Sequence, residues 1–114
     1  MTRLVEVDAV TSWRTRDSLD REIASTETGR AHILQRRPAM SDRLDDVRRT
    51  IASPDPLTRD RTYDRRECFY RRTTSGRRWL KVVVSYRPTG PDGNWTGLVV
   101  TAYFLDCGPS EELP

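Results

Sequence analysis

The only histidine of the chain is its clearest candidate for acid–base chemistry. His32 lies in the stretch Gly-Arg-Ala-His-Ile-Leu-Gln-Arg-Arg-Pro, residues 29–38. An imidazole has an unperturbed pKa of about 6.5, so it exchanges protons readily near neutral pH. On a helix His32 shares a side with Arg36, four residues later. A lone histidine beside an arginine is also an ordinary surface residue, so this stretch alone leaves both interpretations open.

A second group of candidates lies in the two most apolar segments, residues 79–86 and 98–105. Alternate side chains of a strand share one face. If the two strands pair in the natural register, Lys81, Thr101 and Tyr103 lie together on one sheet face. On strict alternation Val99 joins that face, whereas Val100 shares the opposite face with Ala102. A face with this lysine and one or two arginines could cradle a phosphodiester, and a half-exposed face of mixed polarity is the alternative.

The charge of the chain is concentrated in its middle. All but one of the 20 basic residues are arginine, and Lys81 is the exception. Residues 42–78 hold eleven arginines and seven acids, a net charge of +4, whereas residues 82–114 have a net charge of −3. Arginine suits phosphate because its planar guanidinium donates in bidentate fashion. The middle of the chain is therefore the expected anion-facing region, although many of these arginines neighbour acids and could form surface ion pairs.

The first half of the chain predicts an N-terminal arm, residues 1–15, followed by helices within residues 16–53. Residues 2–10 alternate loosely and indicate either a short edge strand or an extended arm. Asp17 or Ser18 could cap a first helix, which either continues through Leu34 or is split by Gly29. Pro38 ends that helix near Arg36. Ser41 then caps a second helix whose buried stripe is expected at Leu44, Val47 and Ile51.

The second half predicts a sheet. From Leu57 the period changes to two, with short strands near residues 62–63 and 67–71 and longer strands at 79–86 and 95–105. The chain of 114 residues is long enough for one domain. We therefore expect one α+β domain in which N-terminal helices pack on one face of an antiparallel meander of about four strands, over residues 57–106, before a short tail, residues 107–114.

The order of several short motifs resembles a known superfamily. The motifs are His32-Ile33-x-x-Arg36-Arg37-Pro38, Ile51-x-x-Pro54-Asp55, Glu67-x-x-Tyr70, Trp79-Leu80-Lys81-Val82-Val83-Val84 and Val99-Val100-Thr101-Ala102-Tyr103. Together, over roughly residues 28–106, they resemble phage-type members of the barnase–EndoU–colicin–RelE nuclease superfamily. Such proteins often carry a histidine where this chain has Arg37.

The resemblance implies a metal-independent endoribonuclease, commonly a toxin or an accessory protein of a mobile element. It implies catalytic roles for His32, Lys81, Thr101 and Tyr103. The RNA-binding residues would be Arg36, Arg37, Arg66, Tyr70 and Arg71. RNA cleavage of this kind needs a base, an acid and a cation beside the phosphorane. If His32 is the acid or base, its replacement by alanine should lower the rate by about 10²–10⁴-fold.

Partners and location follow from the same interpretation. RNA is the expected partner, together with a possible acidic antitoxin or immunity protein, and no cofactor or metal is expected. No apolar run approaches the roughly 20 residues of a membrane span, and no signal peptide is evident, so we expect a cytoplasmic protein. Cys68 and Cys107 fit a reducing compartment, although a disulfide between them stays possible.

Two alternatives to catalysis stay open. The first is a non-catalytic module of the same fold that binds RNA or a protein through its arginines. The second is a partner-binding protein without a nucleic-acid role. Oligomeric state does not follow from the sequence.

Overall fold

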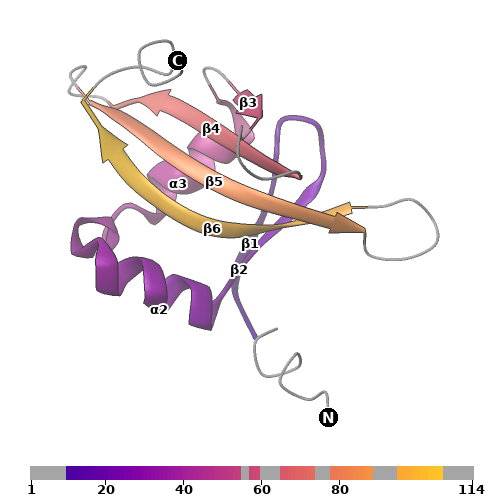
Figure 1. Ribbon diagram of the computed structural model, residues 1–114, viewed down its shortest axis with the longest axis horizontal. Coiled ribbons are helices and arrows are strands. Elements are labelled where there is room, and N and C mark those ends of the chain that lie inside the picture. Colours follow the sequence, from indigo (N-terminus) through magenta and orange to yellow (C-terminus); the bar gives the residue numbers. More distant parts are fainter. Residues whose placement is uncertain (1–9, 55–56, 60–64, 74–77, 89–94, 107–114) are drawn as a thin grey trace.

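Six strands of the described residues form one mixed sheet, and two α-helices pack against one side of it (Figure 1). The computed structural model describes residues 10–54, 57–59, 65–73, 78–88 and 95–106. In chain order the elements are β1 (Thr11–Arg16), β2 (Glu22–Thr26), α2 (Glu27–Arg36), the 3₁₀ helix η1 (Pro38–Met40), α3 (Leu44–Ala52), β3 (Leu57–Arg59), β4 (Arg66–Arg72), β5 (Trp79–Pro88) and β6 (Trp95–Leu105). Strands lie in the order β1-β2-β6-β5-β4-β3.

The C-terminal half confirms the expected α+β class and its antiparallel meander. Strands β3, β4 and β5 each pair antiparallel with the next strand in the chain, which makes a meander that ends at β6. The N-terminal hairpin of β1 and β2 was not predicted, and it extends the sheet because β2 runs parallel to β6. Residues 2–9 of the expected arm and the short strand expected near residues 62–63 lie outside the described residues.

The predicted first helix within residues 16–28 is wrong over most of its length. Asp17 closes a tight turn because its Oδ1 accepts hydrogen bonds from the backbone N–H groups of Leu19 (2.9 Å) and Arg21 (2.8 Å). A short acidic side chain that bonds its own backbone in this way competes with helix formation. Ile23 is then buried in strand β2, whereas Leu19 is 62% exposed. Leu19 and Ile23, four residues apart, therefore do not share the single buried face that a helix would give them.

Helix α2 begins later, at Glu27, and ends at Arg36, where the proline signal placed its end. The side chain of Thr26 caps it by accepting a hydrogen bond from the N–H of Gly29 (2.9 Å). Pro38 opens η1, and the N–H of Ser41 donates to the carbonyl of Pro38 (3.1 Å). Ser41 therefore ends η1 and does not cap α3, which starts at Leu44.

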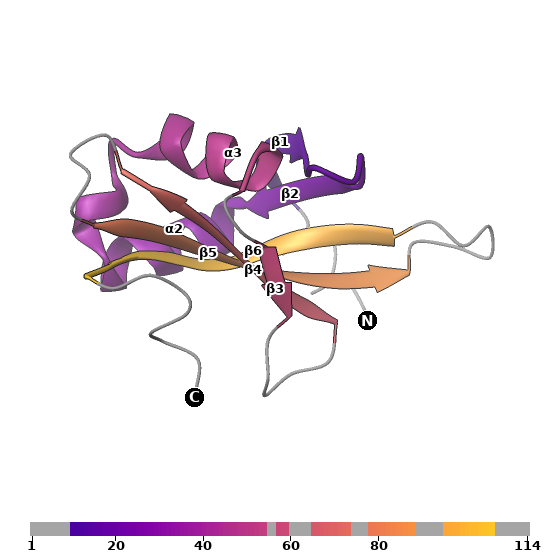
Figure 2. The same ribbon diagram turned by 90° about the horizontal axis from the view of Figure 1, so that it is seen from above.

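The main core lies between the helices and the sheet (Figure 2). The predicted stripe of α3 is confirmed, because Val47 and Ile51 are buried and Leu44 packs against the core. The sheet contributes Ile23, Phe69, Leu80, Val82, Val84, Tyr86, Val99 and Ala102. Among the residues that the structure describes, no helix is long and apolar enough to span a bilayer.

A β-bulge in β6 changes which residues face the core. Val83 pairs with Thr101 but Val84 pairs with Val99, so Val100 is an extra residue in β6. Val99 consequently joins the helix-side core, and Val100 packs on the opposite side. The strict alternation predicted the reverse for both residues, and that part of the prediction is wrong.

Candidate nucleic-acid interface

The sheet surface that faces away from α2 and α3 carries most of the candidate residues, and we call it the second face. It is formed by the positions of β4, β5 and β6 that alternate away from the helix-side core. These positions are Arg66, Cys68, Tyr70 and Arg72 in β4, Trp79, Lys81, Val83, Ser85 and Arg87 in β5, and Thr96, Leu98, Val100, Thr101, Tyr103 and Leu105 in β6.

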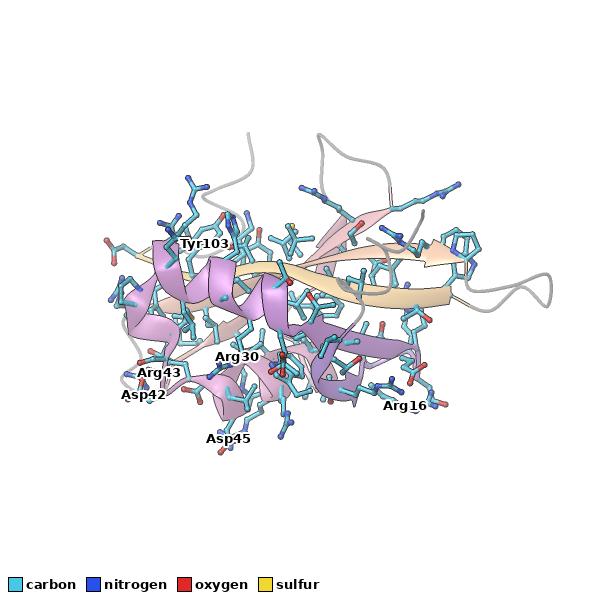
Figure 3. The ribbon with its side chains drawn as sticks, turned by 90° about the horizontal axis from the view of Figure 1, so that it is seen from below. Arg16, Arg30, Asp42, Arg43, Asp45 and Tyr103 are labelled. Atoms are coloured by element: carbon cyan, nitrogen blue, oxygen red, sulfur yellow. The ribbon has the colours of Figure 1, made fainter. Side chains whose placement is uncertain are left out.

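Lys81 lies at the centre of a row across three strands. It pairs with Tyr70 of β4 and with Tyr103 of β6, and its Nζ atom is 5.6 Å from the centroid of each ring. Thr101 lies on the same face, two residues before Tyr103. The predicted grouping of Lys81, Thr101 and Tyr103 is therefore confirmed. Figure 3 shows Tyr103 on one side of the β6 ribbon and Arg30 on the other.

Two arginines extend this row. Arg37 follows the last residue of α2, and its guanidinium carbon lies 5.2 Å from the centroid of the Tyr103 ring. Arg72 lies in the same way over Trp79, at 5.1 Å. Arg37 and Arg72 are both exposed, whereas the two rings are half-buried. Trp79 and Arg72 were not predicted as site residues. The signal was present, because Trp79 shares a strand face with Lys81, and Arg72 shares one with Tyr70.

The second face carries charge of one sign. Its charged positions in β4, β5 and β6 are Arg66, Arg72, Lys81 and Arg87, and none of its described positions in these three strands is acidic. Glu22 of β2, the register partner of Thr96, borders this face and pairs with Arg14. The acidic residue of β4, Glu67, points to the helix side, where it pairs with Arg21. A face of this kind attracts anions, because all four of its charged positions are cationic.

Part of the second face is an apolar layer. Cys68, Tyr70 and Val83 are buried there, and Trp79, Val100 and Leu105 pack against them. Tyr70 is fully buried, so its ring forms a wall beside Lys81 and offers no surface for a base to stack on. Tyr103, which is half-buried, is the accessible tyrosine of the row. Cys107 lies outside the described residues, so the alternative of a disulfide with Cys68 is untested.

His32 lies elsewhere, on the outer side of α2. It is exposed and lines a shallow hollow formed with Glu27, Thr28, Ala31 and Gln35, which all belong to the same helix. The side of α2 that meets the core carries Ile33 and Leu34. The fold therefore does not bring His32 to the row of Lys81.

The remaining candidate arginines have different positions. Arg66 lies on the second face opposite Ser85, and Arg36 is an exposed residue in the last turn of α2. Arg71 points to the helix side, where its Nη1 donates to the carbonyl oxygen of Ser53 (2.9 Å). That contact holds the end of α3 against β4, which is a structural role.

A buried charged cluster, which sequence reasoning missed, lies on the helix side of the sheet. The Asp17 carboxylate accepts hydrogen bonds from Arg21 Nε (2.6 Å) and from the Tyr86 hydroxyl (2.8 Å). Arg21 also donates to Glu67 (2.5 Å), and its guanidinium carbon is 4.1 Å from the centroid of the Tyr86 ring. Burial and the hydrogen bond to Asp17 raise the pKa of Tyr86 well above its ordinary value. The cluster ties the β1–β2 turn to β4 and β5.

Comparisons with protein-family models, with curated proteins and with solved structures find no match. Within the described ranges, no three His, Cys, Asp or Glu side chains converge as metal ligands would. A functional assignment therefore depends on the positions and charges of the second face.

Proposed function

We propose that this protein is an endoribonuclease that binds RNA on the second face and cleaves it without a metal ion. The observation that carries the proposal is the position of Lys81, which lies between two tyrosine rings on a sheet face whose described positions in β4, β5 and β6 include no acidic residue. An anionic phosphodiester fits this surface, and Lys81 is its central cation.

The row supplies cations and hydroxyl groups for cleavage of RNA by its own 2′-hydroxyl. The reaction forms a crowded phosphorane, whose negative charge the Lys81 ammonium would stabilise, with Arg37 as a second cation. As the 2′-oxygen bonds to phosphorus and the bond to the 5′-oxygen breaks, the Tyr103 hydroxyl would give its proton to the leaving 5′-oxygen and take one from the attacking 2′-hydroxyl. The Thr101 hydroxyl would donate to a phosphate oxygen. His32 has no role in this mechanism because it lies on the outer side of α2.

One observation favours a second function, RNA binding without cleavage. The only side chain of the chain with an ordinary pKa near 6.5 is His32, and it does not belong to the row of Lys81. A protein of this charge and shape that lacked an efficient acid–base pair would hold RNA and leave it intact.

A cleavage assay in EDTA tests both functions. Labelled RNA is incubated with the wild type, with Lys81→Met and Tyr103→Phe, and with His32→Ala as the matched control. We expect the wild type to yield 2′,3′-cyclic phosphate ends and Lys81→Met to cleave about 10²–10³-fold more slowly. Lys81→Met keeps the aliphatic stem between the two rings, so a loss of rate reports the charge. His32→Ala should cleave at the wild-type rate.

Other results would reject parts of this assignment. Salt-sensitive retention of intact RNA would support the second function, since phosphate contacts weaken as salt rises. A loss of cleavage in His32→Ala, with Lys81→Met unaffected, would move the catalytic centre to α2. If the wild type neither retains nor cleaves RNA, both functions are wrong.

A further inference from the structure

The second face extends well beyond the row of Lys81. Along β5 the side chains that point to it run from Trp79 to Arg87, eight residues further on. At a rise of about 3.3 Å per residue, this stretch is about 26 Å long. A single catalytic phosphate would occupy only a small part of that length.

The two ends of this surface have different chemistry. The end near Trp79 is aromatic, because Trp79 and Tyr103 are diagonal neighbours on adjacent strands, each with an arginine over its ring. The far end carries Arg66 and Arg87, with Ser85 between their positions. Trp95, the nearby aromatic residue of β6, alternates with Gly97 and Val99 to the helix side, so it does not belong to the second face.

These two chemistries match the two parts of an unpaired nucleotide chain. Bases that are not held in a duplex stack on aromatic rings and on the planes of arginine side chains. The two arginine–aromatic pairs present such planes side by side. The guanidinium groups of Arg66 and Arg87 are bidentate donors, whose geometry suits phosphates.

We infer that the second face binds a single-stranded segment of RNA that lies along β5. Two neighbouring bases stack at Trp79 and Tyr103, and phosphates further along the strand bind Arg66 and Arg87. This inference rests on the proposed RNA-directed function, and it names the form of the substrate and the residues that select it. A duplex fits poorly because its bases are already paired and stacked, so neither ring gains a partner.

Binding is measured separately from cleavage with 2′-O-methyl oligonucleotides, which lack the nucleophile. Fluorescence anisotropy compares labelled single strands of three, six and nine nucleotides with a nine-base-pair duplex. We expect affinity to rise from three to six nucleotides, and the duplex to bind at least ten-fold more weakly than the nine-nucleotide strand. Trp79→Leu should weaken single-strand binding by roughly 5–150-fold, the range that corresponds to one stacked base.

The far end is tested by charge. The double variant Arg66→Gln/Arg87→Gln should reduce the slope of log K against log salt by about 1.4, because each phosphate contact on a single strand contributes about 0.7. Arg30→Gln/Arg49→Gln is the matched control, since it removes the same charge from exposed positions on α2 and α3, on the helix side of the sheet. The control should keep the wild-type slope. Thermal midpoints equal to that of the wild type verify that the variants are folded. The single variant Arg87→Gln, at an exposed position, should reduce the slope by half as much as the double variant.

The results separate this inference from the proposed cleavage. Equal affinity for the duplex, an unchanged affinity of folded Trp79→Leu, or equal slopes for the two double variants would each overturn it. If RNA is cleaved and these results occur, the catalytic proposal survives alone. If no RNA is cleaved but the oligonucleotides bind as stated, the inference survives alone. Stronger binding of polyglutamate than of RNA at equal charge would instead assign the face to an acidic protein and overturn the inference.

Discussion

Replacement of Asp17 by asparagine tests whether the buried charged cluster holds the N-terminal hairpin on the sheet. The Asp17 side chain is fully buried and accepts four hydrogen bonds, two from backbone N–H groups and one each from Arg21 Nε and the Tyr86 hydroxyl. An asparagine has nearly the same shape and keeps one oxygen. Its amide group, however, is a donor that would face the Arg21 Nε–H, which can only donate, whereas the Tyr86 hydroxyl can rotate to accept from it.

The expected cost follows from these contacts. The variant keeps the turn bonds of Leu19 and Arg21 and can reverse the bond with the Tyr86 hydroxyl, but it loses the charge-assisted bond from Arg21 Nε. Hydrogen bonds to charged groups contribute about 1.5–3 kcal/mol each, and breaking a buried ion pair costs about 3–5 kcal/mol. Arg21 keeps its bond to Glu67, which limits the loss. We expect the free energy of unfolding to fall by about 3–4 kcal/mol.

Urea unfolding at pH 7, followed by circular dichroism, measures this change. Glu22→Gln is the control, because Glu22 forms an exposed pair with Arg14 (3.4 Å) and exposed pairs contribute only about 0–1 kcal/mol. A loss in Asp17→Asn no larger than in Glu22→Gln would refute the reasoning, since it would mean that water replaces the contacts of the carboxylate at little cost.

Two further predictions concern the same half of the sheet. Gly97→Ala should lower the free energy of unfolding by about 1–3 kcal/mol, because a Cβ there would lie 2.5 Å from Ile23 Cδ1 and 2.6 Å from Val84 Cγ1. Thermal unfolding measures the loss. A midpoint equal to that of the wild type would contradict the close packing. The raised pKa of Tyr86 means that the folded state favours the neutral phenol, so this stabilisation is complete below pH 10 and is lost as pH rises above the ordinary tyrosine pKa of about 10. The free energy of unfolding should therefore fall above pH 10 by up to about 1.4 kcal/mol per pH unit, and Tyr86→Phe should show a shallower fall; parallel curves would contradict the assignment.

Local sequence patterns predicted the structure correctly where a single rule of backbone geometry determined it. Lys81, Thr101 and Tyr103 share a face because β5 is regular and the bulge of β6 lies before Thr101. The end of α2 follows from Pro38, which disfavours helical conformation in the residue before it.

The same patterns failed where a distant contact decided the outcome. The segment around Ile23 became a strand because it pairs with both β1 and β6, which no local helix signal reveals. Asp17 looked like a helix cap, but its second oxygen is held by Tyr86, 69 residues away in the chain. A contact between residues this far apart in the chain produces no periodic pattern in the local sequence.

In the candidate site, too, some features follow from local patterns and others depend on distant contacts. The sequence by itself determined which side chains of β5 and β6 share a face around Lys81, because alternation is a property of the extended backbone. Only the tertiary structure decided that Arg37 reaches Tyr103, that Arg71 turns to the helix side and that His32 lies on the outer side of α2. The physical reason is that the orientation of α2 depends on which of its sides the sheet buries. That choice depends on Ile33 and Leu34 packing against residues far along the chain.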